Sequence, residues 1–272
     1  ALLNRADVVV LCLPDEAARE AVSLIDNSTT KVLDASTAHR VAPDWVYGLP
    51  ELTASQRTEI AGAGRVSNPG CYPTGFILSV RPLVDAGLLS AHAPMSVHAM
   101  SGYSGGGRNM IERYEANAAA GGSPRPPQSY GLGLDHKHLP EMTRFAGLDA
   151  PPIFSPAVGD YYKGMLVHVP LDQRNLSAGV GAAEIHHALQ TRYATERCIR
   201  VLPLGAPLAL DGGFLDPTAA NGTNRVDLMV FGNDRQAIVV TRFDNLGKGA
   251  SGAAVANLNL MLGLPELAGL TV

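Results

Sequence analysis

The beginning of the chain alternates an apolar strand, an amphipathic helix and a second apolar strand. Val8–Leu13 is apolar throughout, and Pro14 and Asp15 open a helix with its alanines and aliphatic residues on one face. Lys31–Ser36 is the next short apolar strand. Strands that are apolar along their length are typical of a parallel sheet covered on both faces. This order predicts an α/β domain with a doubly wound parallel sheet.

The sequence begins only one short segment before this strand, which has the character of an internal strand. No opening strand and no glycine-rich turn precede Val8. We therefore expect the N-terminal part of the doubly wound sheet to be missing before Ala1.

The middle of the chain follows another pattern, in which short strands succeed one another. Four segments predict strands: "MSVHAMSG", "GMLVHVPL", "VDLMVFGN" and "QAIVVTRF". Asn233 and Asp234 predict a hairpin between the last two, and "AAEIHHALQTRYA" predicts a helix. The mixture indicates a second, α+β domain with a largely antiparallel sheet.

The C-terminal segment returns to a helical pattern. A glycine-rich turn, "NLGKGASG", leads into an apolar helix that we expect to pack against the first domain. The predicted division is one domain of residues 1–70 and 250–272 and another of residues 71–249.

Composition and charge favour a small-molecule ligand. The chain has 272 residues, 46% hydrophobic and 17% charged, which is typical of a globular protein with a sizeable core. The net charge is −4 and the 21 basic residues are scattered singly, which leaves no patch for nucleic acid or an anionic membrane. The longest apolar run is far below the roughly 18 residues that a membrane span requires, so we expect a cytoplasmic protein.

The three cysteines lack CxxC spacing, which argues against a disulfide framework and a zinc site. Cys12 and Cys198 lie in apolar segments and are expected in the core. In "SNPGCYPTGF", Cys71 stands in a rigid turn before a predicted helix, whose N–H groups and dipole lower a thiol pKa. Gly70 is expected to supply unusual dihedral angles and close approach to a ligand. The turn predicts a nucleophile; the alternative is a small buried apolar residue.

The segment "YGLGLDHKHLPEM" groups polar side chains that suit acid–base chemistry. His136 and His138 fall on the same side of an extended chain, with Tyr130 and Glu141 nearby. A histidine beside a reactive thiol can serve as general acid and base near neutral pH. The alternative is the solvated polar start of a helix. Because HExxH and further ligands are missing, no metal site is predicted.

The segment "MSVHAMSGYSGGGRNMIERYEAN" has the order of strand, glycine turn and helix, but its glycine spacing does not fit a dinucleotide-binding fingerprint. Its glycines allow a backbone to approach a ligand, and Arg108 is available for an anionic group. The alternative is an ordinary flexible loop. The loop of residues 118–133 that follows has a length typical of functional loops.

Four segments in this order resemble the N-acetyl-γ-glutamyl-phosphate reductases, in the shorter variant of that family: "SNPGCYPTG", "SGYSGGGR", "YGLGLDHKHLPE" and "NLGKGASGAAVANLNLMLG". The aspartate-semialdehyde dehydrogenases, with a different cysteine context, are the second choice. The resemblance implies a Rossmann-type domain that binds NADP and a glyceraldehyde-3-phosphate-dehydrogenase-like catalytic domain. It also implies NADPH-dependent reduction of an acyl phosphate in arginine biosynthesis, and a homodimer or homotetramer.

The resemblance also assigns roles to matching positions. Cys71 matches the nucleophile and His136 the histidine that assists it. The matches to substrate-binding residues are Arg108, Tyr130, His138 and Glu141, and those to cofactor-binding segments are Ser36, Gly249 and Asn257. His39 departs from the longer variant, which has an acidic residue there, and the family's glycine-rich phosphate turn has no counterpart.

Two other interpretations stay open at this point. A cysteine hydrolase would use the same Cys71–His136 pair to form a thioester that water cleaves, although the "CGSCW" context is missing. A non-catalytic remnant would follow if the phosphate-binding turn were truly lacking. The choice of NADP over NAD rests on the resemblance alone.

Overall fold

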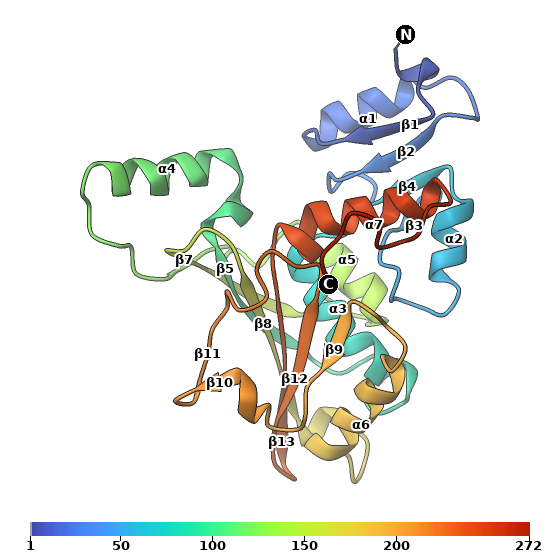
Figure 1. Ribbon diagram of the computed structural model, residues 1–272. Coiled ribbons are helices and arrows are strands. Elements are labelled where there is room, and N and C mark those ends of the chain that lie inside the picture. The colour runs from blue at the N-terminus through green and yellow to red at the C-terminus, as the bar shows by residue number, and fades with distance from the viewer. Residues whose placement is uncertain (1) are drawn as a thin grey trace.

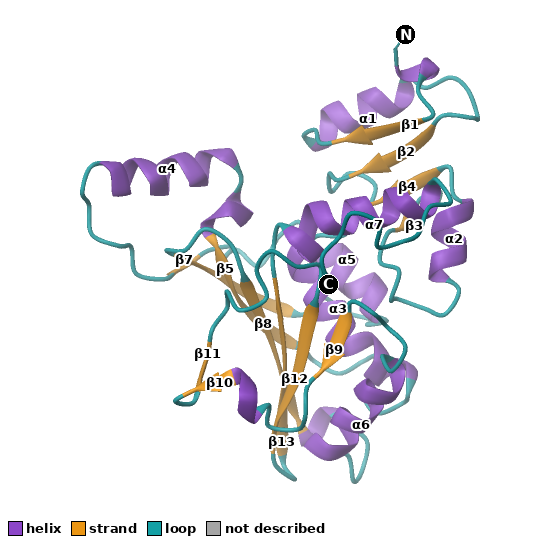
Figure 2. Cartoon of the chain, in the orientation of Figure 1, coloured by secondary structure: helices purple, strands orange, loops and turns teal. Residues whose placement is uncertain are grey.

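The chain folds around two sheets, which the computed structural model describes for residues 2–272 (Figures 1 and 2). The N-terminal sheet has the order β1-β2-β4-β3, and every pairing in it is parallel. Its strands are β1 Val8–Leu11, β2 Lys31–Asp34, β3 Val46–Tyr47 and β4 Arg65–Ser67.

Helices cover both faces of this parallel sheet. Helix α1 (Asp15–Ser23) packs through Ala18 against Val32, while α2 (Gln56–Gly62) packs against the neighbouring Leu33. Because consecutive strand residues point to opposite faces, the two helices lie on opposite sides. The predicted doubly covered α/β sheet is confirmed.

The second sheet is mixed and has the order β6-β7-β5-β8-β13-β12-β9. Four of its six pairings are antiparallel and two are parallel. Its strands are β5 Ser96–Gly102, β6 Gln128–Ser129, β7 Ile153–Gly159, β8 Met165–Asp172, β9 Ile199–Val201, β12 Val226–Gly232 and β13 Gln236–Phe243. A separate hairpin pairs β10 (Leu210–Asp211) with β11 (Phe214–Leu215). The predicted α+β domain and its hairpin between β12 and β13 are confirmed.

Three helices pack with the mixed sheet to form the largest core: α3 Cys71–Asp85, α5 Leu139–Ala146 and α6 Ala182–Arg192. Helix α3 contacts β8 and β13 as well as α5 and α6, so it is buried along most of its length. Helix α4 (Arg108–Ala119) instead extends away from the body of the molecule (Figure 1). No helix within residues 2–272 combines the length and the apolar character that crossing a bilayer requires.

The C-terminal segment connects the two sheets. A π-helical turn, Gly247–Ser251, follows β13 and runs into α7 (Gly252–Met261). Helix α7 contacts α2 and β2, and Met261 joins Leu33 in one buried cluster. This packing is what we expected of the C-terminal helix; the domain limits drawn at residues 70 and 250 stay a prediction.

Strand β7 was not predicted, because Pro152 and Pro156 interrupt its apolar pattern. In the structure it lies between β5 and β6, in parallel register with β5. The strand therefore forms through its neighbours, although its own sequence has a low strand propensity.

Candidate active site

A cavity of about 580 Å³ lies where the parallel sheet meets α3 and α7. Val10 and Cys12 at the end of β1 line one part of it, together with Ala35 beyond β2. The turns before α3 and α7 line other parts, including Cys71 and Gly249, and so do the Ser104–Gly107 turn and His138. The carboxyl ends of parallel strands are where α/β sheets bind their ligands.

Cys71 is the first residue of α3, with Gly70 as its N-cap. Burial raises the pKa of its thiol to about 11, although the backbone N–H of Tyr72 and the nearby Arg40 act in the opposite direction. The expectation of a lowered thiol pKa was therefore wrong for this chain, because desolvation outweighs the helix N-terminus. The thiol needs a proton acceptor to become a nucleophile.

Gly70 lies against a group of charged and polar side chains. A Cβ atom at this position would lie 2.6 Å from Arg40 Nη1, 2.8 Å from Glu141 Oε1 and 2.8 Å from His138 Nε2. The φ of Gly70 is −73°, which any residue adopts. Our expectation of unusual dihedral angles was wrong, and close approach is what requires glycine here.

Glu141 is almost fully buried and receives three hydrogen bonds. Arg40 Nη1 donates to its Oε1 over 2.6 Å, Tyr47 Oη donates to its Oε2 over 2.7 Å, and the Gly70 N–H donates to the same oxygen over 3.1 Å. Burial raises the pKa of Glu141, and these donors oppose that rise. Burial alone would lower the pKa of Arg40, but the Glu141 carboxylate raises it above its usual value. Glu141 thus ties the Cys71 turn to Arg40.

Arg40 is the basic residue that sequence reasoning missed. Its Nε donates to Asn68 O over 3.0 Å and its Nη2 to Ala35 O over 3.2 Å, and its side chain lines the cavity. Arg108, which we had expected to serve an anionic group, is 89% exposed on α4 and pairs with Glu112. The structure brings Arg40 to Cys71 and leaves Arg108 outside the cavity lining. Arg40 stands in "DASTAHR", a segment already of interest for Ser36 and His39.

The two histidines differ in burial and in their neighbours. His138 is buried and lines the cavity, and burial followed by the charge of Arg40 holds its pKa well below the usual range. His136 is half-buried, and burial lowers its pKa to a lesser degree. The His136 ring lies 5.0 Å from that of Phe154 and 6.3 Å from that of Tyr72, centroid to centroid. Both pKa shifts favour the neutral imidazole, and the smaller shift leaves His136 the better proton acceptor.

Tyr130 lies in the same aromatic group, and its hydroxyl donates to Tyr72 Oη over 2.8 Å. Burial raises the pKa of Tyr130 to about 12, so the hydroxyl stays protonated. The side chains of Tyr130, His136, His138 and Glu141 thus lie around the start of α3, and of these four only His138 lines the cavity.

The three residues matched to the cofactor have different positions. Gly249 lines the cavity, and a Cβ atom on it would lie 2.9 Å from Cys71 Cβ. Ser36 donates to Asp34 Oδ2 over 2.7 Å and is buried outside the lining. Asn257 is fully buried and donates to Gly48 O over 2.8 Å and to Asn68 Oδ1 over 3.1 Å. Ser36 and Asn257 therefore lie outside the cavity lining and hydrogen-bond to the segments next to it.

The other two cysteines also differ. Cys198 is buried as expected, but Cys12 is exposed and lines the cavity, so its expected place in the core was wrong. Strand β1 ends at Leu11, and the next residue therefore opens toward the cavity. Within residues 2–272, no group of three or more histidine, cysteine or acidic side chains has the arrangement of a metal site.

Comparisons with known proteins agree with this architecture. Residues 1–60 match the semialdehyde dehydrogenase NAD binding domain, and residues 71–245 match the semialdehyde dehydrogenase dimerisation domain. Aspartate semialdehyde dehydrogenase II from Vibrio cholerae superposes with a TM-score of 0.73 at 16% identity, covering 96% of this chain and 81% of that chain. At this identity the likeness establishes the fold.

Sequence relatives are much closer. N-acetyl-gamma-glutamyl-phosphate reductase 2 of Nostoc sp. is 54% identical over 275 residues, which cover 99% of this chain and 85% of the relative. The N-acetyl-gamma-glutamyl-phosphate reductase of Burkholderia cenocepacia is 52% identical over 268 residues, which cover 98% of this chain and 85% of the relative. The chain therefore belongs to the N-acetyl-gamma-glutamyl-phosphate reductase family.

Proposed function

We propose that this protein reduces N-acetyl-γ-glutamyl phosphate to N-acetylglutamate semialdehyde with NADPH and releases phosphate, a step of arginine biosynthesis. The observation that carries the proposal is Cys71 at the N-terminus of α3, on a cavity lined also by Arg40 and His138. The close relatives named as such reductases give the substrate class.

The cavity suits a nicotinamide dinucleotide. It runs from the carboxyl ends of β1 and β2 to Cys71, and apolar side chains such as Leu33 and Leu258 line it. Gly249 leaves room beside the sulfur, because any Cβ there would crowd Cys71. When bound, the reduced nicotinamide supplies hydride. The choice of NADP follows the family resemblance.

In the first chemical step, Cys71 Sγ forms a bond to the acyl carbon of the substrate. The bond from that carbon to the phosphate oxygen breaks, and phosphate leaves with the electron pair. The product is a thioester on Cys71. Because burial raises the thiol pKa to about 11, the sulfur must lose its proton to a base during attack.

His136 is the candidate for this base. It would also carry the proton when the reduced thioester breaks down to the aldehyde and frees Cys71. Its pKa is lowered less than that of His138, so it binds a proton more readily near neutral pH. It is also half-buried rather than buried, which allows proton exchange with water. His138, with its pKa well below the usual range, suits a hydrogen bond to the substrate.

Hydrogen-bond donors are in position to stabilise the negative charge that develops on the substrate oxygen. The N–H groups of Cys71 and Tyr72 belong to the first turn of α3, where no carbonyl within the helix accepts them. Arg40 makes three hydrogen bonds to protein groups, and its remaining N–H groups can bind an anionic oxygen of the substrate.

The matched dimerisation domain supports an oligomer of this chain. We propose a homodimer or a homotetramer. Light scattering on the purified protein distinguishes the two, and a monomer would contradict both.

The function is tested by following NADPH oxidation and phosphate release together, with N-acetyl-γ-glutamyl phosphate and, separately, with β-aspartyl phosphate. We expect the two signals to appear in equal amounts with the first substrate and to be at least about a hundredfold weaker with the second. Phosphate release without NADPH oxidation would indicate a cysteine hydrolase, and a preference for β-aspartyl phosphate would indicate an aspartate-semialdehyde dehydrogenase.

A further inference from the structure

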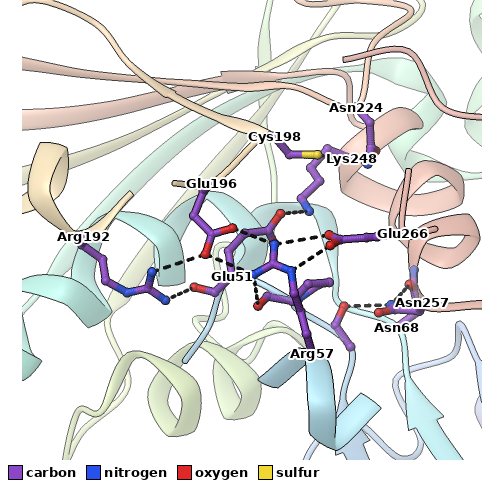
Figure 3. A network of polar contacts seen from close by, with 12 residues as sticks. Glu51, Arg57, Asn68, Arg192, Glu196, Cys198, Asn224, Lys248, Asn257 and Glu266 are labelled. Carbon is purple, nitrogen blue, oxygen red and sulfur yellow. Dashed lines mark hydrogen bonds and ion pairs between the residues drawn. The ribbon is translucent and has the colours of Figure 1, made fainter. Parts of the chain in front are cut away.

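Lys248 is a lysine with no exposed surface, located in the π-helical turn directly before Gly249 (Figure 3). Its Nζ donates to Glu51 Oε1 over 2.6 Å, and the Glu51 side chain has no exposed surface either. The two residues are 197 positions apart in sequence. The pair thus links the segment after β3 to the turn before α7.

Further polar contacts surround this pair (Figure 3). Arg192 Nη2 donates to Glu51 O over 2.6 Å, and Arg57 forms ion pairs with Glu196 over 2.6 Å and with Glu266 over 2.7 Å. The Arg192 bond therefore fixes the Glu51 backbone to the end of α6, while the Arg57 pairs tie α2 to the C-terminal segment without contacting Glu51. Glu51 is a rigid anchor for Lys248.

The turn that Lys248 holds forms one wall beside the catalytic sulfur. Gly249 lies against Cys71, and Asn68 Nδ2 from the loop before Cys71 donates to Ala250 O over 3.0 Å. Lys248 holds the same backbone from the opposite end, through Glu51. The two anchors together fix the wall of the cavity at Cys71.

The buried Lys248–Glu51 pair is not well explained by a contribution to the stability of the fold. Removing two charges from water is unfavourable, and well-packed apolar residues in place of a buried ion pair are often neutral or stabilising. A buried Lys–Glu pair is however directional, because the ammonium must stay within hydrogen-bonding distance of a fixed carboxylate. Such a pair specifies one position of the backbone that carries it.

We propose that the Lys248–Glu51 pair positions the Gly249 backbone against Cys71 and so holds the sulfur in its reactive place. Lys248 and Glu51 are positioning residues for the proposed reaction, since they act through the turn and lie outside the cavity lining. Of the two measurements described below, only the turnover number depends on the proposed function.

The test compares three variants with the unaltered chain: Glu51→Gln, the double variant Lys248→Met with Glu51→Met, and Glu266→Gln. The double variant removes both charges and keeps side chains of similar size, so it should fold. Glu266→Gln is the matched control, because it removes one ion pair from the same network without touching the Lys248–Glu51 bond. Thermal unfolding is recorded for each.

Two readouts are followed. The first is kcat for the reduction of N-acetyl-γ-glutamyl phosphate. The second is the rate at which iodoacetamide alkylates Cys71 at pH 8, measured by mass spectrometry of the Cys71 peptide and needing no reductase activity. When the Gly249 wall loosens, water reaches the sulfur, and each unit by which the thiol pKa falls raises the thiolate fraction about tenfold.

We expect the first two variants to lose at least about tenfold in kcat, because a displaced sulfur reacts poorly, and yet to alkylate faster at Cys71. Glu266→Gln should resemble the unaltered chain in both. The proposal is overturned if the double variant folds with unaltered kcat and alkylation rate, or if Glu266→Gln shows the same changes. If the unaltered chain has no reductase activity but alkylation still separates the variants, the proposed function fails and the positioning role stands.

Discussion

At the scale of a single residue, Cys71 shows which properties can be predicted from the sequence and which cannot. Its turn, flanked by Pro69 and Pro73, indicated a candidate nucleophile, with a small buried apolar residue as the alternative. The sign of its pKa shift could not be predicted, since desolvation depends on the side chains that the fold packs around it. The role of Arg40 was missed for a similar reason, because its partner Glu141 is 101 positions away.

The raised thiol pKa can be measured directly in the free protein. Because the thiolate is the reactive form, the alkylation rate of Cys71 should rise about tenfold per pH unit between about pH 7 and about pH 10. The thiolate becomes the major form only as the pH passes the value of about 11 that burial imposes. A rate that levels off below about pH 9, near the ordinary thiol value, would contradict the desolvated environment.

The histidines should separate in kinetics. His136→Asn removes the proposed proton carrier and should lower kcat about a hundredfold with a smaller change in KM. His138→Asn removes a neutral hydrogen-bonding group at the cavity and should act mainly on KM. Steady-state kinetics check both, and an unchanged kcat with a raised KM for His136→Asn would show that His136 only binds substrate.

At the scale of elements, the periodic segments were predicted well and the short or interrupted ones were not. Strands β8, β12 and β13 are apolar and regular, and their patterns alone identified them. Strand β7 contains Pro156, so its formation depends on pairing with β5. Helix α3 begins at Cys71 rather than after it, so Pro73 is its third residue.

The close packing of α3 on the mixed sheet gives a prediction for Gly75. A Cβ atom at Gly75 would lie 2.9 Å from Val167 Cγ2 and 3.0 Å from Phe243 Cε1, both in the buried core. Gly75→Ala should therefore lower the free energy of unfolding by about 1–3 kcal/mol despite the higher helix propensity of alanine.

Gly62, in α2, is the matched control, because a Cβ atom there would meet nothing within 4 Å. Gly62→Ala should leave the free energy of unfolding unchanged or raise it by up to about 1 kcal/mol. Urea titration measures both variants. Equal effects at the two positions would show that α3 does not approach the sheet as closely as described.

At the scale of the whole molecule, the parallel sheet and the mixed-sheet domain meet at Cys71, the proposed nucleophile. The parallel sheet contributes strand ends and Arg40, and the second domain contributes Cys71 and Glu141. The fold class could be predicted because period and order of elements are local properties of a sequence. The way the two domains pack together could not be predicted, because it depends on contacts between distant segments, such as Lys248–Glu51.

Substitution of the nucleophile tests whether this assembly works through covalent chemistry. Cys71→Ser should still fold, because it exchanges a single side-chain atom at the cavity lining, and should abolish reductase turnover. Activity assays and calorimetry on the same preparation check the two expectations. Substantial remaining turnover in a folded variant would remove Cys71 from the mechanism.

The most direct measurement is the mass of the Cys71 peptide after the protein meets N-acetyl-γ-glutamyl phosphate without NADPH and is quenched in acid. The account predicts an N-acetylglutamyl group bound to Cys71 as a thioester, and none in the Cys71→Ser variant. A protein that turns over with NADPH but carries no acyl group at Cys71 under these conditions would contradict it.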